Sequence, residues 1–287
     1  MSYNIIVLAK QVPDTKNITG DAMKPDGTVN RIALPTIFNP EDLNALEEAL
    51  KIKDEYGAKI TVLTMGPPSA AEVLRQSLFR GADDVILLSD RKFAAADTLA
   101  TSYVLSLAIK KIGKFDLIIG GRQAIDGDTA QVGPQTAEKL KVNQATCVND
   151  IVELTNDSIT VNRNTDHGSE TIKTKLPILL TITAEANTPR PPSVKKTLTY
   201  KNALSLIEKN DYDEEYLKSN KKPFVIKNWD HKDINAKTER CGLTGSPTQV
   251  KKIENIVLET GNFKNIENSA SGIKNLISEL MSEHIIG

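Results

Sequence analysis

The segment from Gly121 to Gln135, GRQAIDGDTAQVGPQ, has the residue types of a turn that binds phosphate. It follows Asp116 to Ile119, a short, β-branched run that is ended by two glycines and predicts a buried parallel strand. In open α/β sheets, ligands lie beyond the carboxyl ends of strands, where loops and helix N-termini present backbone N–H groups to phosphates. The segment therefore predicts one wall of a nucleotide site.

A helix is expected directly after this turn. Asp128 and Thr129 are typical capping residues, and Ala130, Ala137 and Leu140 would lie on the helix. The alternative interpretation of the segment is an ordinary turn rich in small residues. The carboxylates of Asp126 and Asp128 could hold a metal, but an Asp-Gly-Asp sequence at a helix entrance more often makes turn hydrogen bonds, so no metal site is predicted.

Three other strand ends carry small or polar residues suited to the same crevice: Ala9-Lys10-Gln11, Met65-Gly66-Pro67, and the stretch Asp97 to Thr101. Thr98 and Thr101 are three residues apart on a first helical turn, so both hydroxyls could face one phosphate or ribose. The simpler alternative is that Asp97 or Thr98 only caps its helix.

Side chains that could carry out catalysis themselves are scarce. His167, His231 and His284 are expected to be exposed to solvent, and neither Cys147 nor Cys241 has a neighbouring histidine in the sequence. The first strand is not followed by GxGxxG, and GxxxxGK[ST] is absent from the sequence. A nucleotide would thus be held in another way, with the chemistry left to a cofactor.

Alternating strands and helices position these residues in the first half of the chain. Asn39 is a suitable N-cap, Pro40 suits the first helical position, and Glu41 and Asp42 favour the positive helix end. The order predicts an α/β fold with a mostly parallel twisted sheet, helices on both faces and right-handed crossovers. The expected strands are 4–9, 59–65, 85–88 and 117–119, the expected helices are 39–57, 69–80 and 97–112, and residues 10–15 are expected to form a loop.

Beyond about Ala145 the pattern changes. Residues 158–163 and 171–175 predict an antiparallel extension, and residues 176–183 another central strand. The proline-rich stretch 187–194 should be an exposed, stiff loop. We expect an α/β domain over residues 1–220, followed by a C-terminal arm over residues 221–287 that contains Trp229, the turn Gly242 to Pro247 (GLTGSP) and a last amphipathic helix over 271–285.

Composition sets the class of protein. The chain has 287 residues, 39% of them hydrophobic, and 36 basic against 37 acidic residues give a net charge of -1. No overall field would recruit nucleic acid or an anionic membrane, and no apolar run approaches the roughly 20 residues that span a bilayer. Two isolated cysteines do not suggest a disulfide framework. A cytoplasmic protein without membrane insertion is expected.

Five motifs occur in an order that resembles the β subunit of electron-transfer flavoproteins along nearly the whole chain. They are Lys10 to Thr15 (KQVPDT), Asn39 to Asp42 (NPED), Met65 to Pro67 (MGP), Gly121 to Pro134, and Asn187 to Arg190 (NTPR). The resemblance implies an adenine-nucleotide α-hydrolase-like, Rossmann-like domain that pairs with an α subunit. The pocket of such subunits holds AMP in simple electron carriers and FAD in electron-bifurcating members.

The resemblance also implies which residues bind the nucleotide and the partner. Residues 184–197 correspond to the family's recognition loop, which docks on a flavin dehydrogenase, although Pro191 and Pro192 stand where an aromatic residue is frequent. With the two threonines and the helix start at Asp97 added, the expected cofactor-binding residues are Ala9, Lys10, Asn39, Pro40, Glu41, Asp42, Met65, Asp97, Thr98, Thr101, Arg122, Gln123, Ala124, Ile125, Asp126, Gly127, Asp128, Thr129, Ala130, Gln131, Val132 and Gly133.

KQVPDT, the stretch Asp97 to Thr101, and GLTGSP resemble the bifurcating branch of the family. This implies an FAD that accepts a hydride from NADH, or returns it to NAD, and divides electrons between ferredoxin or flavodoxin and a flavin dehydrogenase of the lactate (2-hydroxy-acid) or acyl-CoA type, by way of the α-subunit FAD. Lys10 and Arg122 are the cations that could tune the flavin. Two alternatives stay open: a non-bifurcating carrier with structural AMP, and a nucleotide-binding sensor without redox chemistry.

Overall fold

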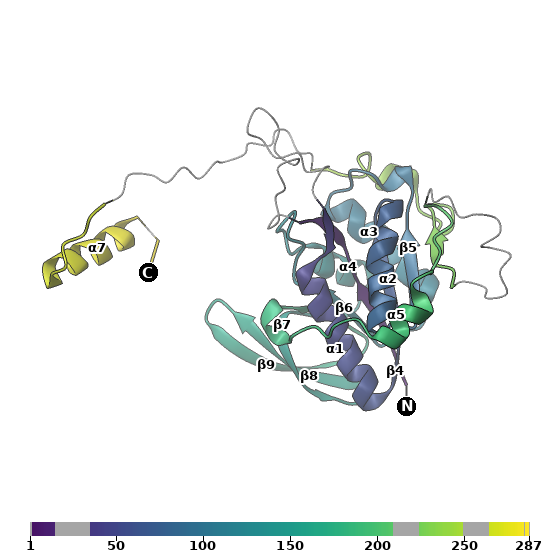
Figure 1. The fold of residues 1–287 in the computed structure, drawn as a ribbon, viewed down its shortest axis with the longest axis horizontal. Helices are drawn as coiled ribbons and strands as arrows, with labels where there is room; N and C mark the ends of the chain where they lie inside the picture. Colours follow the sequence, from purple (N-terminus) through teal and green to yellow (C-terminus); the bar gives the residue numbers. More distant parts are fainter. Residues whose placement is uncertain (1, 15–34, 209–223, 249–263, 284, 287) are drawn as a thin grey trace. The chain divides into compact units, whose positions relative to one another are not determined.

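The computed structural model describes residues 2–14, 35–208, 224–248, 264–283 and 285–286. The chain divides into two compact units, Met1–Val250 and Lys251–Gly287. Figure 1 shows the larger unit as a sheet flanked by helices, and the smaller one as a helix at the C-terminal end of the chain.

The larger unit is built on a nine-stranded sheet in the order β11-β5-β4-β1-β6-β10-β7-β8-β9. All neighbours are parallel except β7 with β8 and β8 with β9, which are antiparallel. The predicted parallel sheet and its antiparallel extension are thus confirmed. The strands are β1 (Tyr3–Leu8), β4 (Ala58–Met65), β5 (Asp84–Leu88), β6 (Leu117–Gly121), β7 (Asn143–Leu154), β8 (Ser158–Thr165), β9 (Gly168–Lys175), β10 (Ile178–Ile182) and β11 (Lys227–Trp229).

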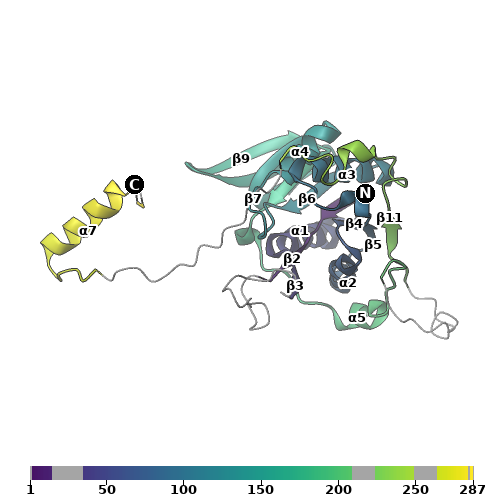
Figure 2. The ribbon, with the colours of Figure 1, turned by 90° about the horizontal axis from the view of Figure 1, so that it is seen from above.

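Helices cover both faces of the sheet (Figure 2). On one face, α1 (Pro40–Tyr56) and α2 (Ala71–Arg80) pack on a core that includes Val7 of β1, while α3 (Thr98–Ile112) and α4 (Val132–Leu140) pack on a second core that includes Leu8. Neighbouring strand residues point to opposite faces, so a strand buried on both faces must be apolar throughout. This is why these strands read as continuous apolar runs.

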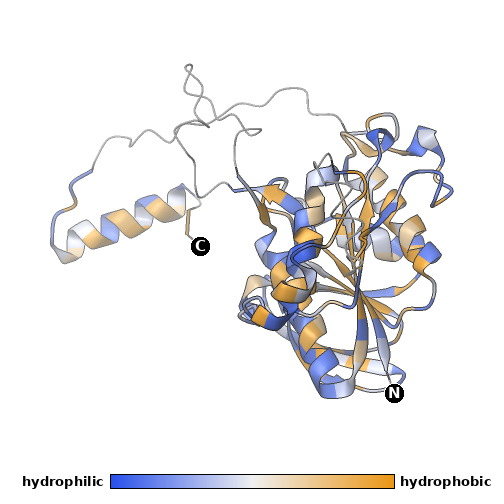
Figure 3. Ribbon diagram, turned by 45° about the vertical axis from the view of Figure 1, so that its right-hand side comes forward, coloured by the Kyte–Doolittle hydropathy of each residue, from blue (hydrophilic) through white to orange (hydrophobic). Residues whose placement is uncertain are grey.

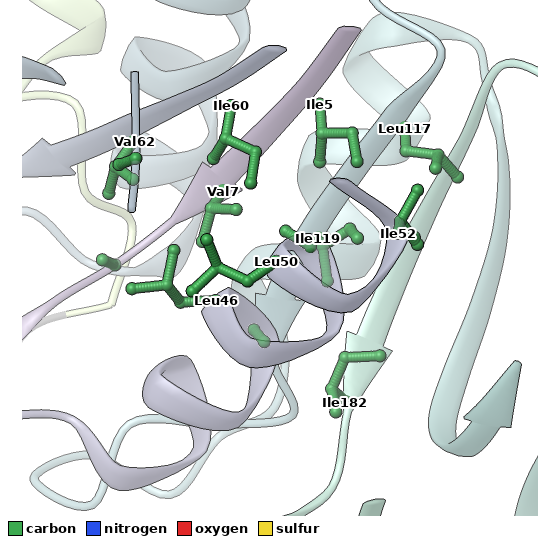
Figure 4. Packing of buried hydrophobic residues seen from close by; sticks show 14 of the residues in the cluster. Ile5, Val7, Leu46, Leu50, Ile52, Ile60, Val62, Leu117, Ile119 and Ile182 are labelled. Atoms are coloured by element: carbon green, nitrogen blue, oxygen red, sulfur yellow. The ribbon is translucent and has the colours of Figure 1, made fainter. Parts of the chain in front are cut away.

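The helix that carries NPED illustrates the packing. Leu46 and Leu50 of α1 lie against Ile5, Val7 and Ile119 of the sheet, and all five are almost completely buried (Figure 4). Proline at the first helical position and two acidic residues in the first turn favour a helix start here. The helix is therefore fixed with its N-terminus at the carboxyl ends of β1 and β6.

Those two strand ends lie at the point where the strand order reverses. β4 and β5 follow on one side of β1, whereas β6 pairs on its other side. Loops after strands diverge at such a switch point and leave a crevice between them. The loop after β1 and the turn after β6 flank this switch point, which is the expected place of the crevice.

Two local expectations are wrong. Gln11–Pro13 of KQVPDT forms a short strand, β2, that pairs antiparallel with β3 (Thr36–Phe38), because Val12 is fully buried and anchors the segment. Thr15 of that motif lies outside the described residues. The helix expected from residue 69 starts with a 3-10 turn, Pro68–Ala70, before α2. β11, which falls within the expected arm, is the edge strand of the sheet.

The described residues of the larger unit also contain three short helical turns and one further helix. They are the 3-10 turns Arg91–Phe93, Ala184–Ala186 and Thr238–Arg240, and the helix α5 (Val194–Tyr200). Residues 187–193 of the proline-rich stretch have no regular secondary structure, and α5 begins inside the expected recognition loop.

The smaller unit contains α7 (Ala270–Ser282), which ends three residues before the expected end at Ile285. Ser269 caps it by accepting a hydrogen bond from the backbone N–H of Gly272 at 3.1 Å. Ile273, Ile277 and Met281 form an apolar stripe along it and are about half exposed in the structure (Figure 3). Within the described residues, no helix is both long and apolar enough to cross a membrane.

Candidate nucleotide-binding site

Asp42 joins the two sides of the crevice. Its carboxylate accepts hydrogen bonds from the backbone N–H of Lys10 at 2.8 Å and of Gly121 at 3.0 Å. The side chain is buried, and this burial raises the pKa of Asp42 to about 7, although the hydrogen bonds to Asn39, Gly121 and Lys10 act in the opposite direction. Asp42 therefore fixes the loop after β1 against the turn after β6.

Glu41 holds the next two residues of the turn. One of its oxygens accepts from Nε and Nη2 of Arg122 at 3.2 and 3.0 Å, and the other accepts from the backbone N–H of Gln123 at 2.9 Å. Glu41 is buried, whereas the side chain of Arg122 is 39% exposed. The hydrogen bond to Glu41 raises the pKa of Arg122 above its usual value. A cation is thus fixed at the surface of the crevice.

Asn39 completes the support beneath the turn. Its side-chain amide donates to the carbonyl of Gln123 at 2.9 Å and accepts from the N–H of Ile125 at 3.2 Å. Asn39 occupies the N-cap position of α1 but makes no side-chain capping bond, so the capping role expected for its side chain is wrong. The amide is used by the turn instead.

The turn itself differs from the helix start that its sequence suggests. Asp128 and Ala130 have φ values of 46° and 52°, in the left-handed region, so α4 begins only at Val132. The carboxylate of Asp128 accepts from Nε2 of Gln123 at 2.9 Å and does not cap α4. Residues 127–131 are exposed. This backbone is accessible for a ligand.

Lys10 and Asp126 form an ion pair between the two sides of the crevice. The ammonium of Lys10 lies 2.7 and 2.8 Å from the two carboxylate oxygens of Asp126. Both side chains are partly exposed. The pair places a second cation at the edge of the crevice, 116 residues away along the chain from its partner.

The start of α3 lies beside the turn. Thr98 donates from its hydroxyl to Oε1 of Gln131 at 2.9 Å and accepts from Nε2 of Gln135 at 3.3 Å. Asp97 caps α3 by accepting from the N–H of Ala100 at 2.9 Å, which confirms its capping role. Thr98 and Thr101 are half-buried. The hydroxyl of Thr98 is thus shared with α4.

The GLTGSP turn packs against the same helix start. Ser246 accepts from the N–H of Asp97 at 2.8 Å, and Asp97 accepts from the N–H of Thr248 at 3.1 Å. A Cβ on Gly242, which has a φ of 52°, would lie 2.4 Å from the carbonyl oxygen of Lys92, so the close approach requires glycine. The expected arm is therefore continuous with the site at this point.

Two hollows flank this turn. The first, of about 290 Å³, is lined by Leu99, Tyr103, Glu239, Arg240 and the turn residues 244–247, and Arg240 stacks over the Tyr103 ring at 4.2 Å from the centroid. The second, of about 500 Å³, is lined by Arg91, Lys92, Ala94, Ala95, Thr238, Glu239, Cys241, Leu243 and Thr244. Arg240 and Gln135 are absent from the residues expected from the sequence. For Gln135 the sequence carried a signal, because this residue follows Gln131 by four positions and the two side chains would share one face of a helix.

The structure brings most of the expected residues together. Ala9 is buried at the end of β1, and Met65 is half-buried at the end of the neighbouring strand β4. The remaining expected residues lie on the segments whose hydrogen bonds are described above. They are Pro40 at the start of α1, and Ala124, Gly127, Thr129 and Gly133 in the turn after β6 and in α4. The expected contacts of all these residues with a nucleotide stay predictions.

The histidines only partly match their expected exposure. His167 is exposed, and His284 lies outside the described residues. His231 is half-buried and contacts the carboxylate of Asp90 through Nδ1, so its expected exposure is wrong. The pairing could not be read from the sequence, because 141 residues separate the two side chains.

The cysteines are unlike in their environment. Cys241 is buried, and this burial raises the pKa of its thiol. Cys147 is half-buried and has a φ of 57° in β7, where the register with β10 shifts. Neither arrangement adds a nucleophile to the crevice.

The order of strands and the crevice at the switch point define an open-sheet α/β protein of the Rossmann-like class. Residues 26–204 match the electron transfer flavoprotein domain family. The chain belongs to this family and within it to the β subunits.

Similar proteins cover most of the chain. It is 45% identical over 249 residues to the electron transfer flavoprotein subunit beta of Clostridium acetobutylicum, covering 87% of this chain and 86% of the relative. It is 43% identical over 284 residues to the caffeyl-CoA reductase-Etf complex subunit CarD of Acetobacterium woodii, covering 98% and 99%. It is 39% identical over 293 residues to the acryloyl-CoA reductase electron transfer subunit gamma of Anaerotignum propionicum, covering 98% and 99%.

Proposed function

We propose that the crevice holds an FAD and that the protein works as the β subunit of an electron-bifurcating flavoprotein. When bound, the FAD would supply hydride exchange with NADH and one-electron transfer toward ferredoxin or flavodoxin and toward the α-subunit FAD. The observation that carries the proposal is the continuity of the site: the turn after β6 meets α3 at Thr98, and α3 meets the GLTGSP turn at Asp97. A surface of that extent suits a dinucleotide better than a mononucleotide.

The residues present fit such a group. The exposed backbone of the turn after β6, with left-handed residues at Asp128 and Ala130, offers N–H groups to a diphosphate. Arg122 and Lys10 supply positive charge at the two sides of the crevice. Arg122 would bind or orient an anionic edge of the cofactor. Lys10 would leave Asp126 and pair with a phosphate of the cofactor instead.

Asn39, Glu41 and Asp42 would act on the cofactor through the turn. Their side chains are buried and bound to backbone or to Arg122, so they hold the ligand-binding loops in place before a ligand enters. Such preorganisation lowers the entropy lost on binding. These three are positioning residues in this proposal.

The family and the names of two relatives support the choice of partners. β subunits pair with an α subunit and with a reductase or dehydrogenase. The relatives from caffeyl-CoA and acryloyl-CoA reductases favour a partner of the acyl-CoA type, while the two prolines after Arg190 leave a 2-hydroxy-acid dehydrogenase as the other candidate. We infer the cytoplasm as the compartment and the C-terminal arm, residues 221–287, as a contact of the α subunit.

Counting nucleotides tests the proposal. The chain is purified with its α subunit, denatured, and its released nucleotides are quantified by chromatography. Two FAD per heterodimer, together with bleaching of the flavin by NADH, support bifurcation. One FAD plus one AMP supports a simple carrier, and a complex without flavin contradicts both redox functions.

A further inference from the structure

Asp90, Asp230 and His231 form a cluster outside the crevice. Each offers one ligand atom, and these atoms all lie within 4.8 Å of one another. Asp90 comes just after β5, and the other two come just after β11, the neighbouring parallel strand at the edge of the sheet. All three residues are half-buried. The cluster therefore rests on two strand ends that are fixed to one another.

Backbone groups orient the two carboxylates. Asp90 accepts from the N–H of Lys92 at 3.0 Å with Oδ1, and its Oδ2 accepts from the backbone N–H of His231 at 3.1 Å and contacts Nδ1 of the same residue. Asp230 accepts from the N–H groups of Lys232 and Asp233 at 2.8 and 2.9 Å, both with Oδ1. Backbone N–H groups thus orient both carboxylates, which is how outer contacts orient metal ligands.

The charges suit a cation. Two carboxylates face the cluster, and the donors around them are backbone N–H groups and the ring of His231. Among the described ion pairs, Arg91, Lys92 and Lys232 pair with neither of them.

We propose that Asp90, Asp230 and His231 bind one divalent transition-metal ion, with Zn²⁺ the best match. One imidazole and two carboxylates are a nitrogen and oxygen set that Zn²⁺ accepts, whereas Mg²⁺ and Ca²⁺ prefer oxygen alone. The ion would take the place of the hydrogen bond between Asp90 and His231, and water would take the open position.

The ion would have a structural role. It would join the ends of β5 and β11. The segment that follows β11 begins at Asp230 and continues to the residues that line the hollows beside the GLTGSP turn. Binding to the native state alone raises stability with ion concentration. The site is independent of whether the crevice holds FAD or AMP.

The experiment uses the full chain in complex with its α subunit, purified without a histidine tag and stripped with a chelator. Zn²⁺ is added, and the retained metal is measured by equilibrium dialysis and elemental analysis. Variants are His231→Gln and Asp230→Asn, and His167→Gln is the matched control because His167 is an exposed histidine in a strand turn. Circular dichroism and nucleotide content report whether each variant is folded.

Wild type and His167→Gln should each retain one more equivalent of Zn²⁺ than either cluster variant and bind it at least tenfold more tightly. Co²⁺ should give visible d–d absorption in wild type that His231→Gln lacks. Equal Zn²⁺ retention in wild type and both folded cluster variants would overturn the proposal. So would a wild-type complex that retains Mg²⁺ or Ca²⁺ at these residues in preference to Zn²⁺.

Discussion

Asp42 and Gly121 approach so closely that no side chain larger than hydrogen fits between them. A Cβ added to Gly121 would lie 2.5 Å from Oδ1 of Asp42 and 2.7 Å from the carbonyl carbon of Glu41. Gly121 also donates its N–H to that same carboxylate oxygen at 3.0 Å. The last residue of β6 is therefore a glycine for steric reasons and not for a positive φ.

Replacing Gly121 by Ala should destabilise the protein. The new methyl group must push the start of α1 away from β6, and overpacking of this kind costs about 1–3 kcal/mol. Gly127→Ala is the matched control, because a Cβ there meets nothing within 4 Å. Denaturant unfolding should show a lower midpoint for Gly121→Ala only. Equal midpoints for the two variants would show that α1 moves aside freely.

Asp42 should make stability depend on pH. Its ordinary pKa of 3.8 is raised to about 7 in the folded state, so between these values the folded protein holds a proton that the unfolded chain has lost. The free energy of unfolding should therefore fall as pH rises from about 4 to about 7, by at most about 1.4 kcal/mol per pH unit, and then level off.

The variant Asp42→Asn cannot titrate at this position and should lack that part of the slope. Measuring the free energy of unfolding of both proteins at several pH values between 4 and 8 checks this. Parallel curves for wild type and variant would mean that Asp42 is ionised throughout, held by its hydrogen bonds.

The sequence predicts the local features of this site but not the interactions between distant segments. The strand, the glycines at its end and the helix start at Asn39 follow from periodicity and propensity, and the structure contains each of them. The sequence predicts Asn39, Glu41 and Asp42 as ligand contacts or helix-end residues. Their partners in the turn after β6 lie 79–86 residues away, so only the fold reveals that they support this turn.

The same limit applies to the helix expected at Asp128. Capping propensity is a local signal, and it favours a start at that residue. The fold overrides it, because Gly133 packs so closely on β10 that a Cβ would lie 2.6 Å from Cγ2 of Thr181, and residues 128–130 must turn to reach that position. Tertiary packing thus moves the start of α4 to Val132.

Arg190 and Glu47 should fix the proline-rich loop to α1. Nε and Nη2 of Arg190 donate to the carboxylate of Glu47 at 2.9 to 3.1 Å, and Nη1 lies 2.9 Å from Asp54. Arg190→Gln removes these hydrogen bonds from the buried carboxylate of Glu47. It should lower the free energy of unfolding by about 1–3 kcal/mol, measured by denaturant unfolding. Lys141→Gln, which breaks the exposed pair with Glu138, should change nothing measurable. A similar small effect of both variants would show that the loop is held by other contacts.

Val194 should contact the partner dehydrogenase. It is 76% exposed at the start of α5, directly after the anchored loop, and Leu198 follows one turn later at 64%. Val194→Asp should leave the melting temperature unchanged and weaken binding of the partner at least tenfold in a pull-down or calorimetric titration. Val152→Asp is the control, since Val152 is 54% exposed on β7. Unchanged partner binding in Val194→Asp would remove α5 from the interface.

Arg122 should tune the cofactor if the crevice holds FAD. Its guanidinium is anchored by Glu41 and partly exposed toward the crevice, and a nearby cation favours a reduced, anionic flavin. Arg122→Ala should therefore lower the two-electron midpoint potential of the β-subunit flavin, on the order of tens of millivolts.

Arg163→Ala is the control, because Arg163 binds Thr146 on the antiparallel extension. Spectroelectrochemical titration of the three complexes measures the shift. Unchanged potentials in Arg122→Ala, with full flavin content, would leave Arg122 with binding or structure alone and make Lys10 the remaining cationic candidate.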